Sequence, residues 1–288
     1  MKSPFNWVGN KYIYIEIINE VVKNKQYDKV IDMFMGTGNI LINIDVKANQ
    51  FIGNDKERLL PMIYKTIAQN DSYFNILRLN HIISTWCNFS KKEDYYAFRD
   101  YWNDKYKTNK FDENFIYETA LLLKMCSNSM VRFNKQDEFN QGFRGLGKLT
   151  EFFQDSMKEL IVDGLNNLKK DLNMRNYQFT TQDAINIEFN EDDLLIIDPP
   201  YILRQDMYSQ DFTINHDNHL LDMIQNNTAD FIYFNYIIRD GETHDNLNNI
   251  LKSNNKLKII ELSNRTKSGQ GSKEIKSVSE VLITNIID

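Results

Sequence analysis

The chain has 288 residues, a formal net charge of −6 and a hydrophobic fraction of 42%. That apolar fraction is sufficient for a packed core and excludes a globally disordered chain. The net charge excludes a uniformly basic surface, but it leaves open a nucleic-acid partner that binds a local cluster of Lys and Arg. The length predicts one main domain with a smaller inserted lobe.

Neither a secretory signal nor a disulfide framework is expected. Residues 1–7 lack the apolar stretch of a signal peptide, and no later run is long enough to cross a bilayer. The two cysteines, Cys87 and Cys126, cannot form a disulfide framework and stand in no metal-binding spacing. The histidines are expected at the surface, because no further metal ligands cluster with them. They are His81, His216, His219 and His244. A reducing cytoplasmic compartment and no bound metal are therefore expected.

Hydrophobic periodicity predicts a chain in which strands and helices alternate. The expected strands are residues 29–34, 50–54, 177–180, 193–197, 229–234, 257–260 and 278–286. Apolar residues at helical spacing predict helices in segments 11–24, 59–64, 94–99, 117–125 and 220–224. Because strand–helix units follow one another directly, the sheet is predicted to be parallel, and the fold class is α/β. Residues 65–176 are mainly helical and interrupt this alternation, so they are predicted to form an inserted lobe.

Two features at strand ends indicate a cofactor. Asp32, Phe34, Gly36 and Gly38 lie where the first strand ends, and a glycine turn there lets backbone N–H groups approach a ligand closely. Asp55 ends the next strand, where a carboxylate can accept hydrogen bonds from both ribose hydroxyls of a nucleoside. A tight turn and a helix N-cap are the alternative explanations of these features. Together they favour a nucleoside cofactor.

The motif Asp198-Pro199-Pro200-Tyr201 follows the apolar run 194–197 and lies at the same edge of the predicted sheet. Two consecutive prolines fix the backbone and remove two N–H donors, which leaves carbonyls directed at the site. The Asp198 carboxylate and the Pro199 carbonyl can each accept one N–H, and the Tyr201 ring offers a stacking face for a planar base. A rigid turn that caps the strand is the alternative. The motif predicts chemistry on an exocyclic amino group.

These motifs together resemble the DNA adenine-N6 methyltransferase family of the alpha group, which includes GATC-type phage and bacterial enzymes. The resemblance spans nearly the whole chain. It implies a Rossmann-like sheet that binds S-adenosylmethionine and an inserted, mainly helical lobe that recognises the target. The catalytic domain is then expected at residues 1–64 and 177–288, and the target-recognition insertion at residues 65–176.

The resemblance also implies individual cofactor contacts. The segment from Trp7 to Lys11 resembles the family's N-terminal cofactor motif, with Asn10 in place of the usual second glycine. Asp183 matches the acidic residue that family members direct at the amino group of the cofactor adenine. The expected cofactor-binding residues are Trp7, Lys11, Asp32, Phe34, Gly36, Gly38, Asp55, Asp183 and Asp198.

A base-reading hairpin is expected in mid-chain. Segments 127–134 and 139–143 are similar to the hairpin with which GATC methyltransferases read their site, although the family commonly has a proline where Gly142 stands. Arg132 matches an arginine that reads guanine, and arginine can donate two hydrogen bonds to guanine O6 and N7. A second basic segment, 265–276, offers phosphate contacts, with a solvated charged loop as the alternative. The expected DNA-binding residues are Asn128, Met130, Arg132, Asn134, Asn140, Lys267 and Lys273.

The function implied is site-specific methylation of adenine N6 in double-stranded DNA, with the target base flipped out of the duplex and a GATC-like site. The expected catalytic residues are Asp198, Pro199, Pro200 and Tyr201. We expect a monomer or weak dimer on DNA in the cytoplasm, associated with the nucleoid, and leave open a cognate restriction enzyme. The alternatives are the same chemistry on RNA adenine, cytosine N4 or glutamine, and a non-catalytic DNA-binding regulator with a methyltransferase fold.

Overall fold

The computed structural model describes residues 2–6, 9–86, 89, 91–127, 129–145, 155–203, 212–239, 241–262 and 279–287. The chain divides into two compact units. We call the first the helical unit; it comprises Met1–Tyr12, Gly36–Asn43 and Glu57–Thr181. We call the second the sheet unit; it comprises Ile13–Met35, Ile44–Lys56 and Gln182–Asp288. The division into a catalytic domain and a target-recognition insertion, which the sequence predicts, remains a prediction.

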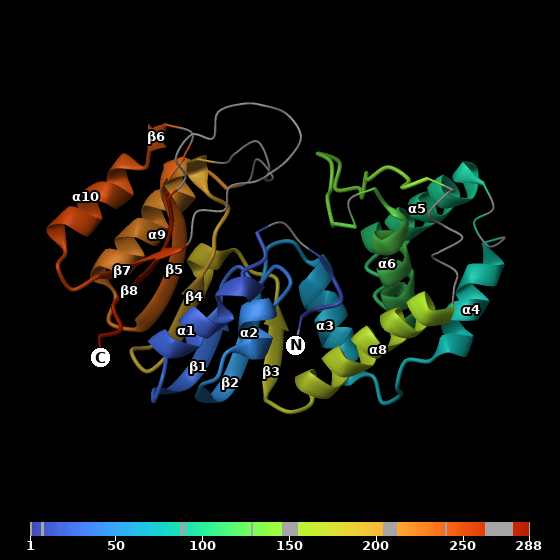
Figure 1. The fold of residues 1–288 in the computed structure, drawn as a ribbon, viewed down its shortest axis with the longest axis horizontal. Helices are drawn as coiled ribbons and strands as arrows, with labels where there is room; N and C mark the ends of the chain where they lie inside the picture. The colour runs from blue at the N-terminus through green and yellow to red at the C-terminus, as the bar shows by residue number, and fades with distance from the viewer. Residues whose placement is uncertain are drawn as a thin grey trace. The chain divides into compact units, whose positions relative to one another are not determined.

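The sheet unit contains most of the strands of the chain (Figure 1). Its strands are β1 (Gln26–Asp32), β2 (Lys47–Asn54), β4 (Leu194–Ile197), β5 (Asp230–Arg239), β6 (Glu242–Thr243), β7 (Lys258–Leu262) and β8 (Ser279–Thr284). The helices with them are η1 (Tyr12–Tyr14), α1 (Ile15–Val21), η4 (Ala184–Asn186), α9 (Ile214–Asn226) and α10 (Asp245–Ser253).

The strands of this unit lie in the order β2-β1-β4-β5-β8-β7, with β6 paired to β5. β1 is parallel to β2 and β4, and β4 is parallel to β5. β8 runs antiparallel between β5 and β7. The sheet is therefore mostly parallel, and its carboxyl edge is formed by strands that are neighbours in space.

One face of the sheet is buried under α9 and α10. Every second residue of the neighbouring strands points to this face, because successive side chains of a strand point to opposite faces of the sheet. They are Ile31, Leu195, Ile197, Phe231, Tyr233, Val281 and Ile283, and they pack with Leu220, Leu221 and Ile224 of α9 and Leu247 of α10. β4 is buried on both faces, since all its residues are buried. This packing holds the strand that precedes Asp198 at the centre of the sheet.

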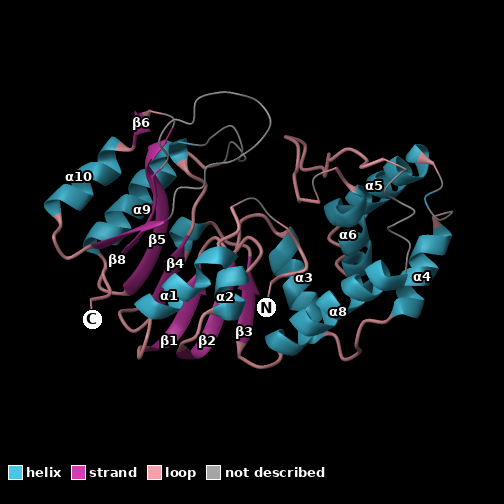
Figure 2. Cartoon of the chain, in the orientation of Figure 1, coloured by secondary structure: helices cyan, strands magenta, loops and turns pink. Residues whose placement is uncertain are grey.

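The regular structure in the described part of the helical unit is mainly helical (Figure 2). Its elements are α2 (Asn39–Asn43), α3 (Leu59–Gln69), α4 (Ile76–Thr85), α5 (Lys92–Lys107), α6 (Glu113–Met125), α8 (Asp155–Leu172) and β3 (Tyr177–Thr180). α6 packs against α3, α4 and α5, and it is buried along nearly its whole length. Such all-round burial identifies α6 as the central helix of the unit.

Local sequence explains where several of these helices begin. The side chain of Asn75 accepts a hydrogen bond from the N–H of Arg78 at the start of α4, and Asp112 does the same for Phe115 at the start of α6. Asp94 caps the start of α5, and Lys105 and Lys107 lie in its last turn. Each arrangement satisfies terminal backbone groups or complements the helix dipole. None of the helices in the described ranges is both long and apolar enough to span a membrane.

The predicted strands and helices are confirmed, with shifts at their ends. β1 begins at Gln26 rather than Lys29, because its first half has a solvent face and alternates exposed and buried residues. The segment 11–24 contains a short 3₁₀ turn, η1, before α1. The expectation of surface histidines is wrong for His244, which is only 5% exposed and lies with its Nε2 atom 3.1 Å from the Asp217 carboxylate.

Candidate active site

Three carboxylates follow neighbouring parallel strands at the carboxyl edge of the sheet unit. Asp32 ends β1, Asp55 directly follows β2, and Asp198 directly follows β4. Burial raises the pKa of Asp32 well above its usual range, and the charges of Asp198 and Asp55 raise it further, against the effect of a hydrogen bond from the N–H of Phe34. The structure therefore brings these predicted residues into one acidic cluster.

Asp32 is buried without full hydrogen bonding. It is 2% exposed, and its Oδ1 atom has no hydrogen-bond partner among the residues that the structure describes. A buried polar atom without a partner is costly, and like charges nearby add to the cost. A proton or a cationic ligand would relieve it.

Tyr201 connects Asp198 to a residue that the sequence did not indicate. Its hydroxyl lies 2.8 Å from Oδ1 of Asp198 and 3.2 Å from Oε1 of Glu280, a residue of β8. Tyr14 donates a hydrogen bond to the other oxygen of Glu280 over 3.3 Å. A phenol has one proton, so Tyr201 can donate to only one of its two carboxylates at a time.

The Tyr201 ring is itself enclosed. It is 3% exposed, and it packs edge to face against Tyr236 with ring centroids 4.7 Å apart. Within the same motif, Pro199 is buried and Pro200 is half-buried. The motif that the sequence indicated is thus in contact with β5 through Tyr236 and with β8 through Glu280.

Asp183 lies in a polar group of its own. Lys56 Nζ is 3.0 Å from its Oδ2 atom and His216 Nε2 is 3.6 Å from the same oxygen. Partial burial acts to raise the pKa of Asp183, but hydrogen bonds from Lys56 and the N–H of Ile185, with the charges of Lys56 and His216, lower it overall. Asp183 is therefore held as an ionised acceptor.

Aromatic rings adjoin this group. The ring of Phe212 stacks on His216 at 5.6 Å, and Phe34 meets Phe212 edge to face at 6.2 Å. Asn54 ties the Asp183 segment to the strand ends: its amide accepts from the N–H of Gln182 over 2.8 Å and donates to the Gln182 carbonyl over 3.1 Å. Predicted residues Phe34 and Asp183 thus belong to one neighbourhood within the sheet unit.

The glycine turn and the N-terminal segment belong to the helical unit. Gly36 has φ of 46° and Gly38 has φ of 65°, a left-handed conformation that favours glycine. The amide of Asn39 donates to Thr37 Oγ1 over 2.8 Å and to Asn10 Oδ1 over 3.0 Å. Asn10, which replaces the usual glycine, therefore braces this turn.

For some predicted site residues, the structure adds no support for a contact with a ligand. Lys11 is buried, and its Nζ donates to the Gly9 carbonyl over 3.0 Å. Trp7, Asn128, Lys267 and Lys273 lie outside the described residues. Cofactor or DNA contact by these residues stays a prediction.

The mid-chain segment forms a β-hairpin, which we define as residues 131–140. Phe133 and Phe139 form an antiparallel bridge, and the N–H of Asn140 donates to the Arg132 carbonyl over 3.2 Å. The turn is closed by a 2.9 Å bond from the N–H of Asn134 to the Glu138 carbonyl, and Asp137 has φ of 57°. A left-handed residue at this place is typical of three-residue hairpin loops.

The outward side of the hairpin carries Arg132 and Asn140, which are both exposed. Met130 is half-buried and precedes the hairpin. The Asn134 side chain is engaged within the turn, since its oxygen accepts from two backbone N–H groups and its amide donates to Glu138. Asn134 therefore builds the turn in this structure, whereas Arg132 has its side chain at the surface.

No group of three or more potential metal ligands occurs among the residues described. The mostly parallel sheet with its acidic carboxyl edge defines an α/β protein of the Rossmann-like methyltransferase type. The model of the D12 class N6 adenine-specific DNA methyltransferase family matches residues 7–280, and the chain belongs to this family. This match confirms the predicted reaction, methylation of adenine N6 in DNA, and the predicted enzyme class. No curated protein matches the chain.

Proposed function

We propose that the protein transfers a methyl group from S-adenosylmethionine to N6 of an adenine flipped out of duplex DNA. The acidic cluster at the sheet edge is the observation that carries this proposal. Asp32 is buried with an unpartnered oxygen and lies in the field of Asp55 and Asp198. A ligand with a sulfonium and an ammonium group fits such a site, because positive charge stabilises the ionised carboxylates.

The sheet unit supplies three of the residues that would hold the cofactor, Phe34, Asp55 and Asp183. Asp55 would accept hydrogen bonds from the ribose hydroxyls, and the ionised Asp183 would accept one from the adenine amino group. Phe34 lies beside them and offers apolar contact. When bound, S-adenosylmethionine supplies an electrophilic methyl group. The contacts of Trp7, Lys11, Gly36 and Gly38 with the cofactor are proposed from the resemblance alone.

Asp198 and Pro199 would act on the target amino group. The Asp198 carboxylate and the Pro199 carbonyl each accept one N–H of the adenine amino group, which orients the nitrogen lone pair for transfer. Asp198 takes up the proton that the nitrogen loses after methylation. It need not be a strong base, because the methylated nitrogen is cationic before the proton leaves.

Tyr201 would orient Asp198 through the 2.8 Å hydrogen bond to its Oδ1 atom. We propose in addition that the target base stacks on the Tyr201 ring. The ring is 3% exposed in this structure, so stacking requires the ring to be uncovered when DNA binds. Flipping the base out of the helix is what gives the amino group access to Asp198.

The hairpin would read the DNA sequence. Arg132 is exposed on it, and a guanidinium can donate two hydrogen bonds to one guanine in the major groove. We propose a GATC-like target from the resemblance of Asn128, Met130 and Arg132 to the reading hairpin of GATC methyltransferases. A monomer or weak dimer on DNA, a location at the nucleoid and a cognate restriction enzyme belong to the same proposal.

The test is methyl transfer to DNA of random sequence. The protein is incubated with methyl-labelled S-adenosylmethionine and unmethylated duplex DNA, the modified nucleoside is identified, and modified positions are mapped by sequencing. We expect N6-methyladenine next to guanine in one short sequence. Label in cytosine or in the protein would overturn the substrate, and failure to bind the cofactor in calorimetry would overturn the donor.

A further inference from the structure

We propose that helix α5 sets the register of the hairpin and that Asn103 is the positioning residue for sequence recognition. The inference rests on the proposed reading role of the hairpin. Tyr95, Arg99, Asn103 and Lys107 are four residues apart along α5 and so lie on one face of the helix. This face is directed at the returning side of the hairpin and the residue after it.

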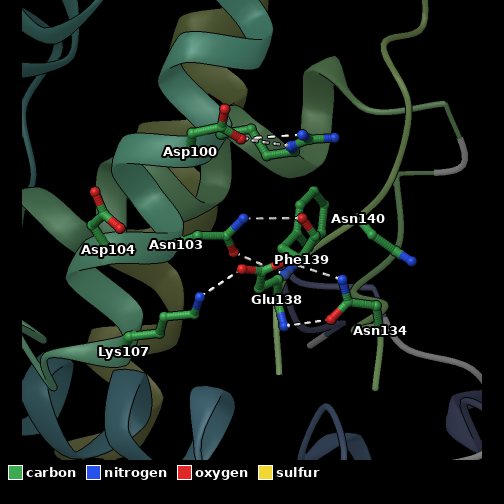
Figure 3. Close-up of a pocket in the computed structure, with 9 residues that line it drawn as sticks. Asp100, Asn103, Asp104, Lys107, Asn134, Glu138, Phe139 and Asn140 are labelled. Carbon is green, nitrogen blue, oxygen red and sulfur yellow. Dashed lines mark hydrogen bonds and ion pairs between the residues drawn. The ribbon is translucent and has the colours of Figure 1, made fainter. Parts of the chain in front are cut away.

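As the chain of α5 advances, its contacts move backward along the returning side of the hairpin. Tyr95 donates to the Gln141 carbonyl over 2.8 Å. Asn103 bonds to Phe139, and Lys107 Nζ lies 2.5 Å from Glu138 Oε1 (Figure 3). The charge of Arg99 also acts on Glu138. α5 is therefore an extended support for the hairpin rather than a single point of contact.

Asn103 makes the central contact with both groups of its side-chain amide. Its oxygen accepts from the N–H of Phe139 over 2.8 Å, and its nitrogen donates to the Phe139 carbonyl over 3.2 Å. Asn103 is 7% exposed and Phe139 is buried, so these backbone groups need partners within the protein. An aspartate could only accept and an alanine could do neither.

Two rings of α5 hold the inward side of the hairpin. Trp102 lies 5.6 Å from Phe139, and Tyr106 stacks on Phe133 at 4.9 Å. Since side chains alternate along a strand, the inward placement of half-buried Phe133 and buried Phe139 turns Arg132 and Asn140 outward. A slip of one residue would reverse these faces. The two hydrogen bonds between Asn103 and the Phe139 backbone oppose such a slip and so keep Arg132 at the surface.

A hollow of about 160 Å³ marks this junction. Its lining includes Lys107, Glu138 and Asn134, which hydrogen bonds connect in this order, and Asn103, which bonds to the backbone of Phe139 (Figure 3). Of the other lining residues, Arg99 pairs with Asp100 rather than with the hairpin. The hollow therefore lies at the contact between α5 and the hairpin.

The chain offers a closely matched control for Asn103. Asn166 of α8 makes the same pair of bonds to a different backbone segment: it accepts from the N–H of Phe74 over 2.8 Å and donates to the Phe74 carbonyl over 2.9 Å. Asn103→Ala and Asn166→Ala thus remove equivalent hydrogen bonds from one unit. Only the first removes them from the hairpin.

The experiment measures methylation of a library of duplexes that differ at the bases around the target adenine. We expect wild type and Asn166→Ala to share one ratio of kcat/KM between the preferred site and its single-base variants. Asn103→Ala should lower this ratio about tenfold or more, with Asn103→Asp in between, because base discrimination depends on the outward face of Arg132. Thermal unfolding of each variant reports the loss of stability separately.

The outcomes distinguish the inference from the proposed function. A wild-type protein that methylates no DNA adenine would contradict the function. A specific wild type with equal discrimination in Asn103→Ala and Asn166→Ala would overturn the role of α5. If Asn103→Ala does not fold, Lys107→Met decides, since it breaks an exposed pair with Glu138. We expect a loss of discrimination of about threefold, and unchanged discrimination would overturn the inference.

Discussion

Tyr201 and Glu280 meet across 79 residues of sequence, with 3.2 Å between the phenol oxygen and a carboxylate oxygen. Because the same phenol also bonds to Asp198, Glu280 can affect Asp198 through the single proton of Tyr201. This relationship extends the candidate active site from the motif on β4 to the closing strand β8.

The contact predicts coupled effects of substitution. Tyr201→Phe retains the ring but loses the hydroxyl, and Glu280→Gln removes one of the two competing carboxylates. We expect Tyr201→Phe to lower kcat about tenfold, as removal of a supporting hydrogen bond commonly does in enzyme sites. Glu280→Gln alone should raise kcat, because the phenol proton is then no longer shared with a second carboxylate. In the Tyr201→Phe background, Glu280→Gln should have no further effect, because both changes act through one hydrogen bond. Steady-state kinetics on a DNA substrate measures this, and independent, multiplicative effects would contradict the coupling.

Asp198→Asn should abolish most of the activity. An amide nitrogen in place of one oxygen removes the charge that stabilises the amino group as it loses its proton. We expect kcat to fall at least about 100-fold, in line with the loss of one electrostatic contact in a transition state. Calorimetry with S-adenosylmethionine provides the control, and its affinity should change less than kcat. A variant that retains full activity would remove Asp198 from the mechanism.

The raised pKa of Asp32 predicts how stability varies with pH. Between the ordinary value of 3.8 and the higher pKa in the fold, the folded state binds more protons than the unfolded state. The free energy of unfolding therefore falls as pH rises through this range. An asparagine at this position does not ionise, so the variant does not lose stability in this way. The Tm of Asp32→Asn should increasingly exceed that of wild type as the pH rises above 3.8, until the carboxyl of Asp32 is ionised in the folded protein. Thermal unfolding without cofactor tests this, and the opposite trend would show that Asp32 ionises readily.

Arg132 and Lys135 should differ in their effects on DNA binding. Both are exposed on the hairpin, and only the first is predicted to read a base. Arg132→Ala should reduce discrimination at one guanine by about 1–3 kcal/mol. Lys135→Ala should weaken binding about equally for all sequences and lower the salt dependence. Binding titrations at several salt concentrations measure both, and equal behaviour of the two variants would argue against base reading by Arg132.

Much of the acidic cluster could be predicted because it depends on local order along the chain. Asp32, Asp55 and Asp198 each stand where an apolar run ends, and the ends of neighbouring parallel strands meet at one edge of a sheet. Lys56 and His216 could not be found in this way. Their contact with Asp183 depends on how the segment before η4 and the start of α9 are packed.

The sequence by itself determined the order of strands and helices, the acidic strand ends and the family resemblance, because these depend on periodicity and short motifs. Only the tertiary structure decided which second carboxylate contacts the Tyr201 hydroxyl and which side chain forms hydrogen bonds with the Phe139 backbone. Asn103 and Phe139 are 36 residues apart, and nothing in the spacing of either segment specifies the other. Hydrogen bonds of this kind arise when packing buries a backbone group and one nearby side chain can satisfy it.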